Sequence, residues 1–205
     1  MNAKTKKQQI NWLQYVLFAA LILVLFFTDL GTSVRGGIQQ LLLKTGLKDA
    51  PTAGEPALAS QQMALSAYPY QLTLTTLDGK SVQLSDLKGK VVFLNQWATW
   101  CSPCRAEMPA IEKLYQSVDK NKIAFVMLSL DEDPQKVRQV VNQKKFTFPV
   151  YVPGGQMPEA FYSSAIPTTL ILDSNGQIAQ RIEGMANYDT DEFRQYLTSL
   201  YKPTR

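Results

Sequence analysis

The two cysteines of this chain lie three residues apart in the segment WATWCSPC, residues 97–104, and they are the only cysteines among its 205 residues. Two thiols at this spacing can form a small disulfide, supply part of a metal site, or exchange electrons as a dithiol. A disulfide scaffold needs several crosslinks in a short chain, so Cys101 and Cys104 cannot form one. A metal site, a pair of buried small side chains and a redox pair remain.

The absence of histidine from the whole chain narrows these choices. A zinc site at Cys101 and Cys104 would need two carboxylates to complete four ligands, which disfavours a structural zinc ion. The same absence excludes a Ser/His or Cys/His hydrolase, a haem held by histidine and a copper site built on histidine. Buried cysteines are common in protein cores, so a purely structural pair stays open at this point.

The formal net charge of +4 is unevenly distributed along the chain. Lys4, Lys6 and Lys7 precede every acidic residue, and the rest of the chain is nearly neutral. The excess of positive charge therefore describes a short N-terminal flank, and it predicts no nucleic-acid surface.

An apolar segment follows this basic flank. From Trp12 to Phe27 the sequence reads WLQYVLFAALILVLFF. Extended to Leu30 as a helix, it would span about 28 Å, one hydrocarbon thickness of a membrane. The lysines before it favour a cytoplasmic N-terminus, with the rest of the chain on the other side. A cleaved signal peptide is the alternative, but only residues 31–33 (Gly-Thr-Ser) weakly resemble a nearby cleavage site.

The chain is thus expected to have four parts. Residues 49–67 are rich in Ala, Pro, Gly, Ser and Gln, a composition typical of a flexible tether. The predicted parts are a cytoplasmic basic flank (1–11), a transmembrane anchor or uncleaved signal (12–30), a short amphipathic helix with a flexible tether (31–67) and a globular domain (68–205).

The sequence pattern of residues 68–205 predicts a mixed α/β domain. Leu72 and Leu74 alternate with polar residues before an Asp-Gly turn at 78–79, a pattern that predicts a hairpin. We expect Asp189 to cap the last helix, with Glu192 as its partner three residues later. This order of elements makes a mixed sheet covered on both faces. Hydrophobic patterns predict strands at 91–95, 123–130, 146–152, 168–172 and 177–183, with helices around 108–118, 137–141 and 193–201.

The segment VVFLNQWATWCSPC, with AIPTTLILDSNGQI downstream, resembles the thioredoxin fold and, more narrowly, the membrane-anchored thiol–disulfide oxidoreductases of the TlpA/ResA type. The similarity runs from about residue 70 to residue 200. It rests on WCxxC after a strand, Ile-Pro-Thr before a hairpin, and a glutamate three residues past the second cysteine. The resemblance implies a thioredoxin-like mixed central sheet flanked by helices, with an N-terminal hairpin, an inserted strand and helix, and a preceding transmembrane helix.

The resemblance assigns roles to the residues around the cysteines. Cysteines three apart share a face in the first turn of a helix, whose N-terminus favours a thiolate. We expect Cys101 to attack a substrate disulfide and Cys104 to resolve the mixed disulfide. The family implies a cis bond between Ile166 and Pro167 facing this redox disulfide, with Ile166 offering main-chain groups to an extended substrate. Trp100 is expected to be partly exposed and to contact the substrate.

Proton transfer at the cysteines needs a titratable group. Asn95 stands where thioredoxins have a buried aspartate, and asparagine cannot titrate. The resemblance instead gives Glu107, one helical turn beyond Cys104, a proton-handling or tuning role. A solvated surface glutamate is the alternative, because charged residues are usually exposed. Trp97 continues the preceding strand and is expected in the core.

The predicted function is thiol–disulfide exchange outside the bacterial cytoplasmic membrane, by a single-pass protein that needs no metal or organic cofactor. The resemblance implies reduction of disulfides in extracytoplasmic proteins, including apocytochrome c, with electrons from a membrane thiol carrier. The alternatives are an oxidase or isomerase of the same fold and a non-enzymatic scaffold. A peroxiredoxin-like peroxidase is a further alternative, although its Pro-x-x-x-Thr-x-x-Cys motif is missing here.

Overall fold

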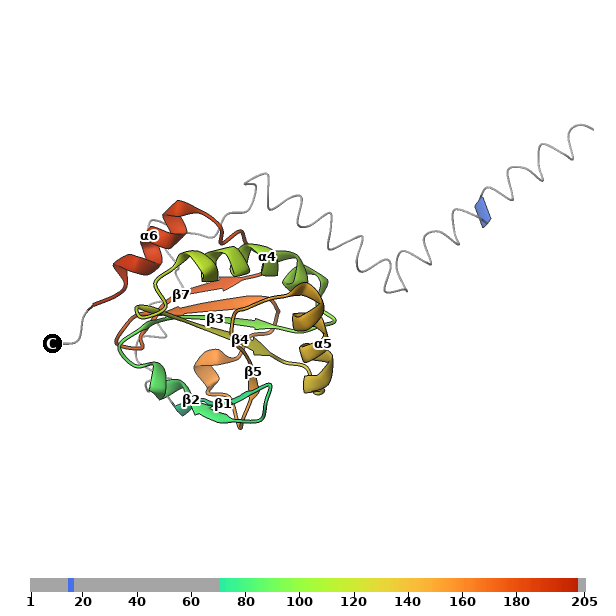
Figure 1. Cartoon of the computed structure of the whole chain (residues 1–205), viewed down its shortest axis with the longest axis horizontal. Helices are drawn as coiled ribbons and strands as arrows, with labels where there is room; N and C mark the ends of the chain where they lie inside the picture. Colours follow the sequence, from blue (N-terminus) through green and yellow to red (C-terminus); the bar gives the residue numbers. More distant parts are fainter. Residues whose placement is uncertain (1–14, 17–70, 203–205) are drawn as a thin grey trace, which may run out of the picture.

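The computed structural model describes residues 15–16 and 71–202 (Figure 1). The predicted basic flank at 1–11 and the predicted amphipathic helix with its tether at 31–67 lie outside these residues, as do all but two residues of the predicted anchor at 12–30. Within the described residues, no helix combines the length and the apolar character needed to cross a membrane.

A seven-stranded mixed sheet forms the centre of the domain (Figure 1). Its strand order is β2-β1-β5-β4-β3-β6-β7. The three central strands β3, β4 and β5 are parallel, whereas β6 and β7 on one side and β1 and β2 on the other pair antiparallel with their neighbours. The strands are β1 (Thr73–Thr76), β2 (Ser81–Gln83), β3 (Val91–Trp97), β4 (Ile123–Ser129), β5 (Val150–Pro153), β6 (Thr168–Leu172) and β7 (Ile178–Glu183).

Helices cover the sheet unequally on its two faces. Every residue of β3 is buried, which fits a central parallel strand with apolar packing on both sides. Phe93 and its neighbours pack against all three α-helices, whereas Val92 and Leu94 face a second apolar cluster beneath two short 3-10 helices. The sheet is covered on both faces as predicted, but the described α-helices share one face. These helices are α4 (Ser102–Ser117), α5 (Pro134–Lys144) and α6 (Asp191–Ser199), and the 3-10 helices are η2 (Leu84–Leu87) and η3 (Glu159–Phe161).

Both predicted hairpins are present, at β1–β2 and at β6–β7. Gly79 and Gly176 adopt positive φ angles of 87° and 82° in the two turns, a conformation that glycine adopts without steric cost. Asp173 holds the second turn, because its Oδ1 accepts hydrogen bonds from the backbone N–H groups of Asn175 and Gln177.

Two predicted boundaries are wrong. The strand predicted at 146–152 is β5 (Val150–Pro153), since Phe146 and Phe148 stack on each other in the connection before it. The last helix is capped by Thr190, whose Oγ1 accepts a hydrogen bond from the Phe193 backbone N–H at 3.2 Å. The predicted cap, Asp189, instead pairs with basic side chains of α4 and α6.

Candidate active site

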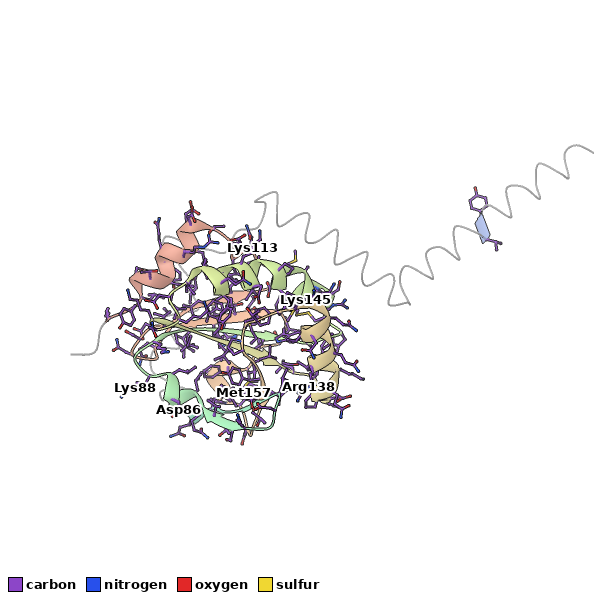
Figure 2. The ribbon with its side chains drawn as sticks, viewed as in Figure 1. Asp86, Lys88, Lys113, Arg138, Lys145 and Met157 are labelled. Carbon is purple, nitrogen blue, oxygen red and sulfur yellow. A yellow bond between two sulfur atoms is a disulfide. The ribbon has the colours of Figure 1, made fainter. Side chains whose placement is uncertain are left out.

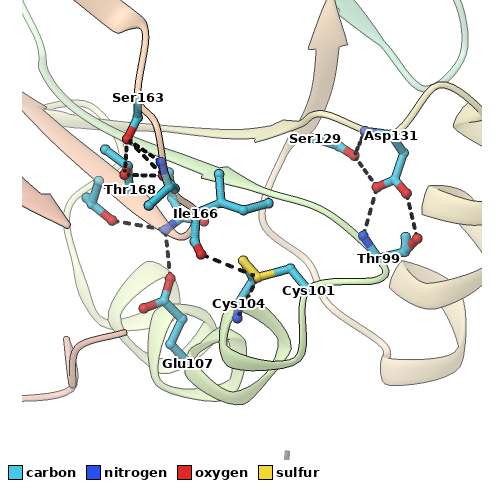
Figure 3. Close-up of a disulfide and its surroundings, with 12 residues drawn as sticks. Thr99, Cys101, Cys104, Glu107, Ser129, Asp131, Ser163, Ile166 and Thr168 are labelled. Atoms are coloured by element: carbon cyan, nitrogen blue, oxygen red, sulfur yellow. Dashed lines mark hydrogen bonds between the residues drawn. A yellow bond between two sulfur atoms is a disulfide. The ribbon is translucent and has the colours of Figure 1, made fainter. Parts of the chain in front are cut away.

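The cysteine pair lies where β3 leads into α4 (Figure 3). Cys101 is the N-cap of α4, and its Sγ accepts a hydrogen bond from the Cys104 backbone N–H at 3.2 Å. Pro103 occupies the first turn, where its missing N–H costs no helical hydrogen bond. Cys101 and Cys104 form a disulfide. Unpaired N–H groups and the helix dipole at this position stabilise a negative sulfur.

The two cysteine residues differ slightly in solvent exposure. Cys101 is 5% exposed and Cys104 is 1% exposed, so both are buried and Cys101 is slightly the more accessible of the two. Trp100 precedes it and is 69% exposed, whereas Trp97 is completely buried in the core. The predicted exposure of Trp100 and burial of Trp97 are both confirmed.

The loop before β6 brings the predicted cis bond to the disulfide (Figure 3). The peptide bond between Ile166 and Pro167 is cis, and the Ile166 carbonyl oxygen lies 3.8 Å from the Sγ of Cys101. The hydroxyl groups of Ser163 and Thr168 fix this loop. Their oxygen atoms lie 2.8 Å apart, and each hydroxyl is within hydrogen-bond distance of the carbonyl oxygen of residue 165. Sequence positions 65 residues apart therefore meet at one sulfur atom.

Glu107 is completely buried, so the alternative of a solvated surface glutamate is wrong. Its Oε1 accepts a hydrogen bond from Asn95 Nδ2 at 2.8 Å, and its Oε2 accepts one from the Ala186 backbone N–H at 3.1 Å. Glu107 lies three residues after Cys104, so its carboxylate is on the same side of α4 as that cysteine. Asn95, which cannot titrate, thus binds the residue that can.

A chain of polar side chains continues from Glu107 into the core. Asn95 Nδ2 also donates to Thr169 Oγ1 at 2.9 Å, and this hydroxyl lies 2.7 Å from that of Tyr188. Burial, and after it the negative charge of Glu107, raises the pKa of Tyr188 well above its ordinary value, while the hydrogen bond with Thr169 opposes the rise. Sequence reasoning missed Thr169 and Tyr188, although a polar residue inside the apolar run TTLIL was a signal.

A third missed residue, Asp131, holds the loop that carries Trp100. Its carboxylate accepts hydrogen bonds from the backbone N–H of Thr99 at 2.8 Å, from the Thr99 hydroxyl at 2.6 Å and from the Ser129 hydroxyl at 2.7 Å. Figure 3 shows this group and the Ile166 loop on either side of Cys101. The sequence held only a general signal, an acidic residue two positions after the end of β4, near which the end of the neighbouring parallel strand β3 lies.

Two basic residues, Lys90 and Arg105, lie at different distances from the cysteines. Lys90 precedes β3, at the opposite end of the strand from Cys101, and it donates a hydrogen bond to the Lys120 carbonyl. Arg105 follows Cys104 directly on α4. Among the described residues, no group of three or more cysteine and acidic side chains is placed to hold a metal ion.

Comparisons with known proteins agree with this geometry. The redoxin family model matches residues 52–200. The thiol-disulfide oxidoreductase ResA of Bacillus thuringiensis subsp. konkukian is 32% identical over 141 residues, which cover 68% of this chain and 80% of that protein. The ResA of Oceanobacillus iheyensis is 39% identical over 114 residues, covering 55% and 59% of the two chains.

Solved structures show the same fold. A thiol:disulfide interchange protein of the thioredoxin family from Chlorobium tepidum superposes with a TM-score of 0.53 at 26% identity, covering 64% of this chain and 99% of that one. StoA from Bacillus subtilis superposes with a TM-score of 0.54 at 23% identity, covering 63% and 99%. With a thioredoxin-like fold, a CxxC disulfide at a helix N-terminus and these relatives, the chain belongs to the redoxin family, among the thiol–disulfide oxidoreductases of the ResA type.

Proposed function

We propose that this protein reduces disulfide bonds in proteins outside the cytoplasm, with Cys101 as the nucleophile and Cys104 as the resolving thiol. The observation that carries the proposal is the arrangement at Cys101. Cys101 is the slightly more exposed residue of the pair, and its sulfur caps α4 and lies beside the Ile166 carbonyl. An extended substrate segment can pair with the main chain at Ile166 and Pro167 and contact Trp100 while its disulfide faces Cys101.

The exchange proceeds in two steps that balance in electrons and protons. The Cys101 thiolate attacks one sulfur of the substrate disulfide, forming a mixed disulfide and releasing the other substrate sulfur as a thiolate. The Cys104 thiolate then attacks the Cys101 sulfur, which releases the second substrate thiol and leaves the Cys101–Cys104 disulfide. The dithiol loses two electrons and two protons, and the substrate gains them.

Glu107 is proposed to handle the proton of Cys104. Its carboxylate lies one helical turn beyond that cysteine and is shielded from water. The buried thiol must lose its proton before the resolving step, and a positioned carboxylate is a suitable acceptor. Apparent pKa values then belong to the coupled group of two thiols and one carboxyl.

The net direction is proposed to be reduction, with electrons supplied by a thiol carrier in the membrane and apocytochrome c among the substrates. Ser102 and Pro103 separate the cysteines, so no cationic side chain between them stabilises the reduced form as a strong oxidant requires. We expect a reduction potential nearer to thioredoxin, at about −270 mV, than to DsbA, at about −120 mV. Equilibration with glutathione buffers measures it, and a value above about −150 mV would identify an oxidase instead.

Trapping separates the roles of the two cysteines. Cys104→Ser should accumulate mixed disulfides with client proteins, because no resolving thiol remains, whereas Cys101→Ser should not. Reduction of insulin by the wild-type dithiol is the matching activity assay. Equal trapping by both single variants would contradict the role assignment.

The predicted anchor and location also belong to this proposal. The basic flank followed by an apolar run of membrane-spanning length supports an N-terminus inside and a catalytic domain outside the cytoplasmic membrane. Alkaline phosphatase fused after Arg205 should be active. A silent fusion would overturn this orientation, and a mature N-terminus beyond Phe27 would establish cleavage.

A further inference from the structure

A groove lies between α4 and α5, beside the cysteine pair. Its volume is about 260 Å³. Small-molecule sites usually enclose about 300–1,000 Å³, so this groove suits individual side chains of a polypeptide better than an organic cofactor. The lining combines four apolar residues with two basic ones: Met108, Pro109, Val140, Phe146, Arg105 and Lys144.

The groove begins one helical turn beyond the nucleophile on α4. Cys101, Arg105 and Met108 follow one another at helical spacing, and the Arg105 backbone N–H donates to the Cys101 carbonyl at 3.1 Å. One helical turn rises about 5.4 Å, and an extended chain covers about 6.6 Å in two residues. A substrate whose sulfur meets Cys101 can therefore place a side chain two or three residues away in the groove.

No described residue forms an ion pair with the two basic residues of the groove, Arg105 and Lys144. The nearby buried Glu112 is already bound by the main chain at Thr147. Figure 2 shows the end of α5, marked by Lys145, next to α4, so positive charge gathers where the two helices meet.

We propose that this groove binds an acidic residue and an adjacent apolar side chain of the polypeptide that exchanges its disulfide with Cys101. The proposal rests on the thiol–disulfide exchange proposed above and adds a substrate preference to it. The guanidinium of Arg105 can bind a carboxylate through two parallel hydrogen bonds, and Lys144 adds a second positive charge. Met108, Val140 and Phe146 supply apolar contact for the neighbouring side chain.

The test compares two synthetic peptides, each with one cysteine carrying a nitrothiobenzoate leaving group. They differ only in Leu-Glu or Leu-Lys placed two residues from that cysteine. Mixed-disulfide formation with the full chain carrying Cys104→Ser releases a coloured thiolate, and it reports peptide preference whichever direction the wild type works in. We expect the Leu-Glu peptide to react about threefold to tenfold faster, the range that one or two partly exposed ion pairs supply.

Charge reversal locates the preference in the groove. Arg105→Glu with Lys144→Glu, in the same Cys104→Ser background, should invert the preference between the peptides. Lys88→Glu with Lys136→Glu is the matched control, because it changes the net charge equally at exposed positions outside the groove. Its preference should remain that of the parent, and each peptide rate is divided by the rate of the same variant with the uncharged 2,2′-dithiodipyridine, so that a general change in thiol reactivity cancels.

Equal rates of the two peptides with the parent would overturn the proposal, and so would inversion of the peptide preference by the control pair as well as by the groove pair. Equal inhibition of both peptide reactions by free glutarate would also overturn it, because the groove would then bind a small anion. Failure of the proposed reductase function looks different. It would appear as an oxidising potential of the wild type, with the peptide preference of the Cys104→Ser chain intact.

Discussion

Two buried glutamates, five residues apart on α4, bind very different partners. Glu112 holds the connection that precedes β5, because its carboxylate accepts hydrogen bonds from the Thr147 N–H at 2.9 Å, the Thr147 hydroxyl at 2.5 Å and the Phe148 N–H at 3.4 Å. Gln116 donates a fourth hydrogen bond at 2.8 Å. Glu112 thus ties one loop to the helix.

Glu107 binds groups that converge from other parts of the fold. Asn95 reaches it from the middle of the sheet, and the Ala186 N–H reaches it from the segment between β7 and α6. It lies on the turn of α4 that follows Cys104, and its charge acts on the buried Tyr188. Its neighbours are thus the redox centre and a polar chain in the core.

The difference shows that burial does not by itself mark a carboxylate for chemistry. Both side chains are buried in the same helix and both are satisfied by hydrogen bonds. Glu112 accepts hydrogen bonds from the main chain of a loop and so holds that loop in place, which is a structural role. Glu107 adjoins a thiol that must lose a proton, which gives its charge a functional consequence. Variants of the two residues should therefore separate stability from thiol chemistry.

The largest effect on stability is expected for Glu112→Ala. We expect the free energy of unfolding to fall by about 2–3 kcal/mol, because two main-chain N–H groups and a hydroxyl lose their acceptor. Urea unfolding of the oxidised protein measures the change. Glu112→Gln, which keeps one oxygen, should lose less. The alkylation–pH curve of the reduced thiols should match that of the wild type in both variants, and a shifted curve would contradict a purely structural task.

Glu107→Gln should change the thiols more than the fold. Removing the negative charge stabilises a thiolate, so the alkylation–pH curve of the reduced protein should move to lower pH. The unfolding free energy should fall by only about 1 kcal/mol. The new amide can face Asn95 if that side chain turns over, because Asn95 Oδ1 has no partner among the described residues. Superimposable curves for wild type and variant would remove Glu107 from the proton pathway.

The sequence predicted those parts of this site that depend on local pattern or on the family resemblance. The apolar run at Val91 predicted the strand, and the family resemblance predicted the helix start at the cysteines, their disulfide and the cis bond at Pro167. The resemblance also singled out Glu107. These features are encoded in short segments, so one chain is enough to recognise them.

Contacts between distant segments could not be predicted in this way. Thr99 and Asp131 are 32 residues apart, and nothing in either segment names the other. The cap of α6 shows the same limit, because both Asp189 and Thr190 are suitable cap residues. The basic partner Lys113 on α4 draws Asp189 away, leaving Thr190 as the cap. Tertiary partners therefore decide between choices that local chemistry leaves equal.

Tyr188 distinguishes the two glutamates at high pH. Its pKa is raised in the folded state, so the unfolded chain releases this proton first, and stability is lost as the pH rises above about 10. Between pH 8 and about pH 10.5 this tyrosine should lower the free energy of unfolding by about 0.8 kcal/mol, and Tyr188→Phe should remove that decrease. Glu107→Gln should remove a smaller part, and Glu112→Gln none. Urea unfolding at the two pH values measures these differences, and equal effects of the two glutamine variants would contradict the assignment.

The smallest effect is expected at a third carboxylate, Asp131. Like Glu112 it binds the main chain, and like Glu107 it lies near the cysteines. Asp131→Ala leaves the Thr99 N–H and hydroxyl without their acceptor, so the segment carrying Trp100 loses its fixed position. Insulin reduction should slow about threefold, under 1 kcal/mol in the barrier, because a polypeptide substrate must dock against Trp100.

The thiol should change less than in Glu107→Gln, since the N-terminus of α4 still holds the Cys101 sulfur through the Cys104 N–H. The alkylation–pH curve of Asp131→Ala should therefore shift less than that of Glu107→Gln. Asp131→Asn keeps one oxygen for the Thr99 N–H, and hydroxyl groups can rotate to suit the new amide, so insulin reduction should recover. If alkylation slows as much as insulin reduction does, Asp131 acts on the sulfur. If Asp131→Asn fails to restore the rate, its charge rather than its hydrogen bonds is what the site requires.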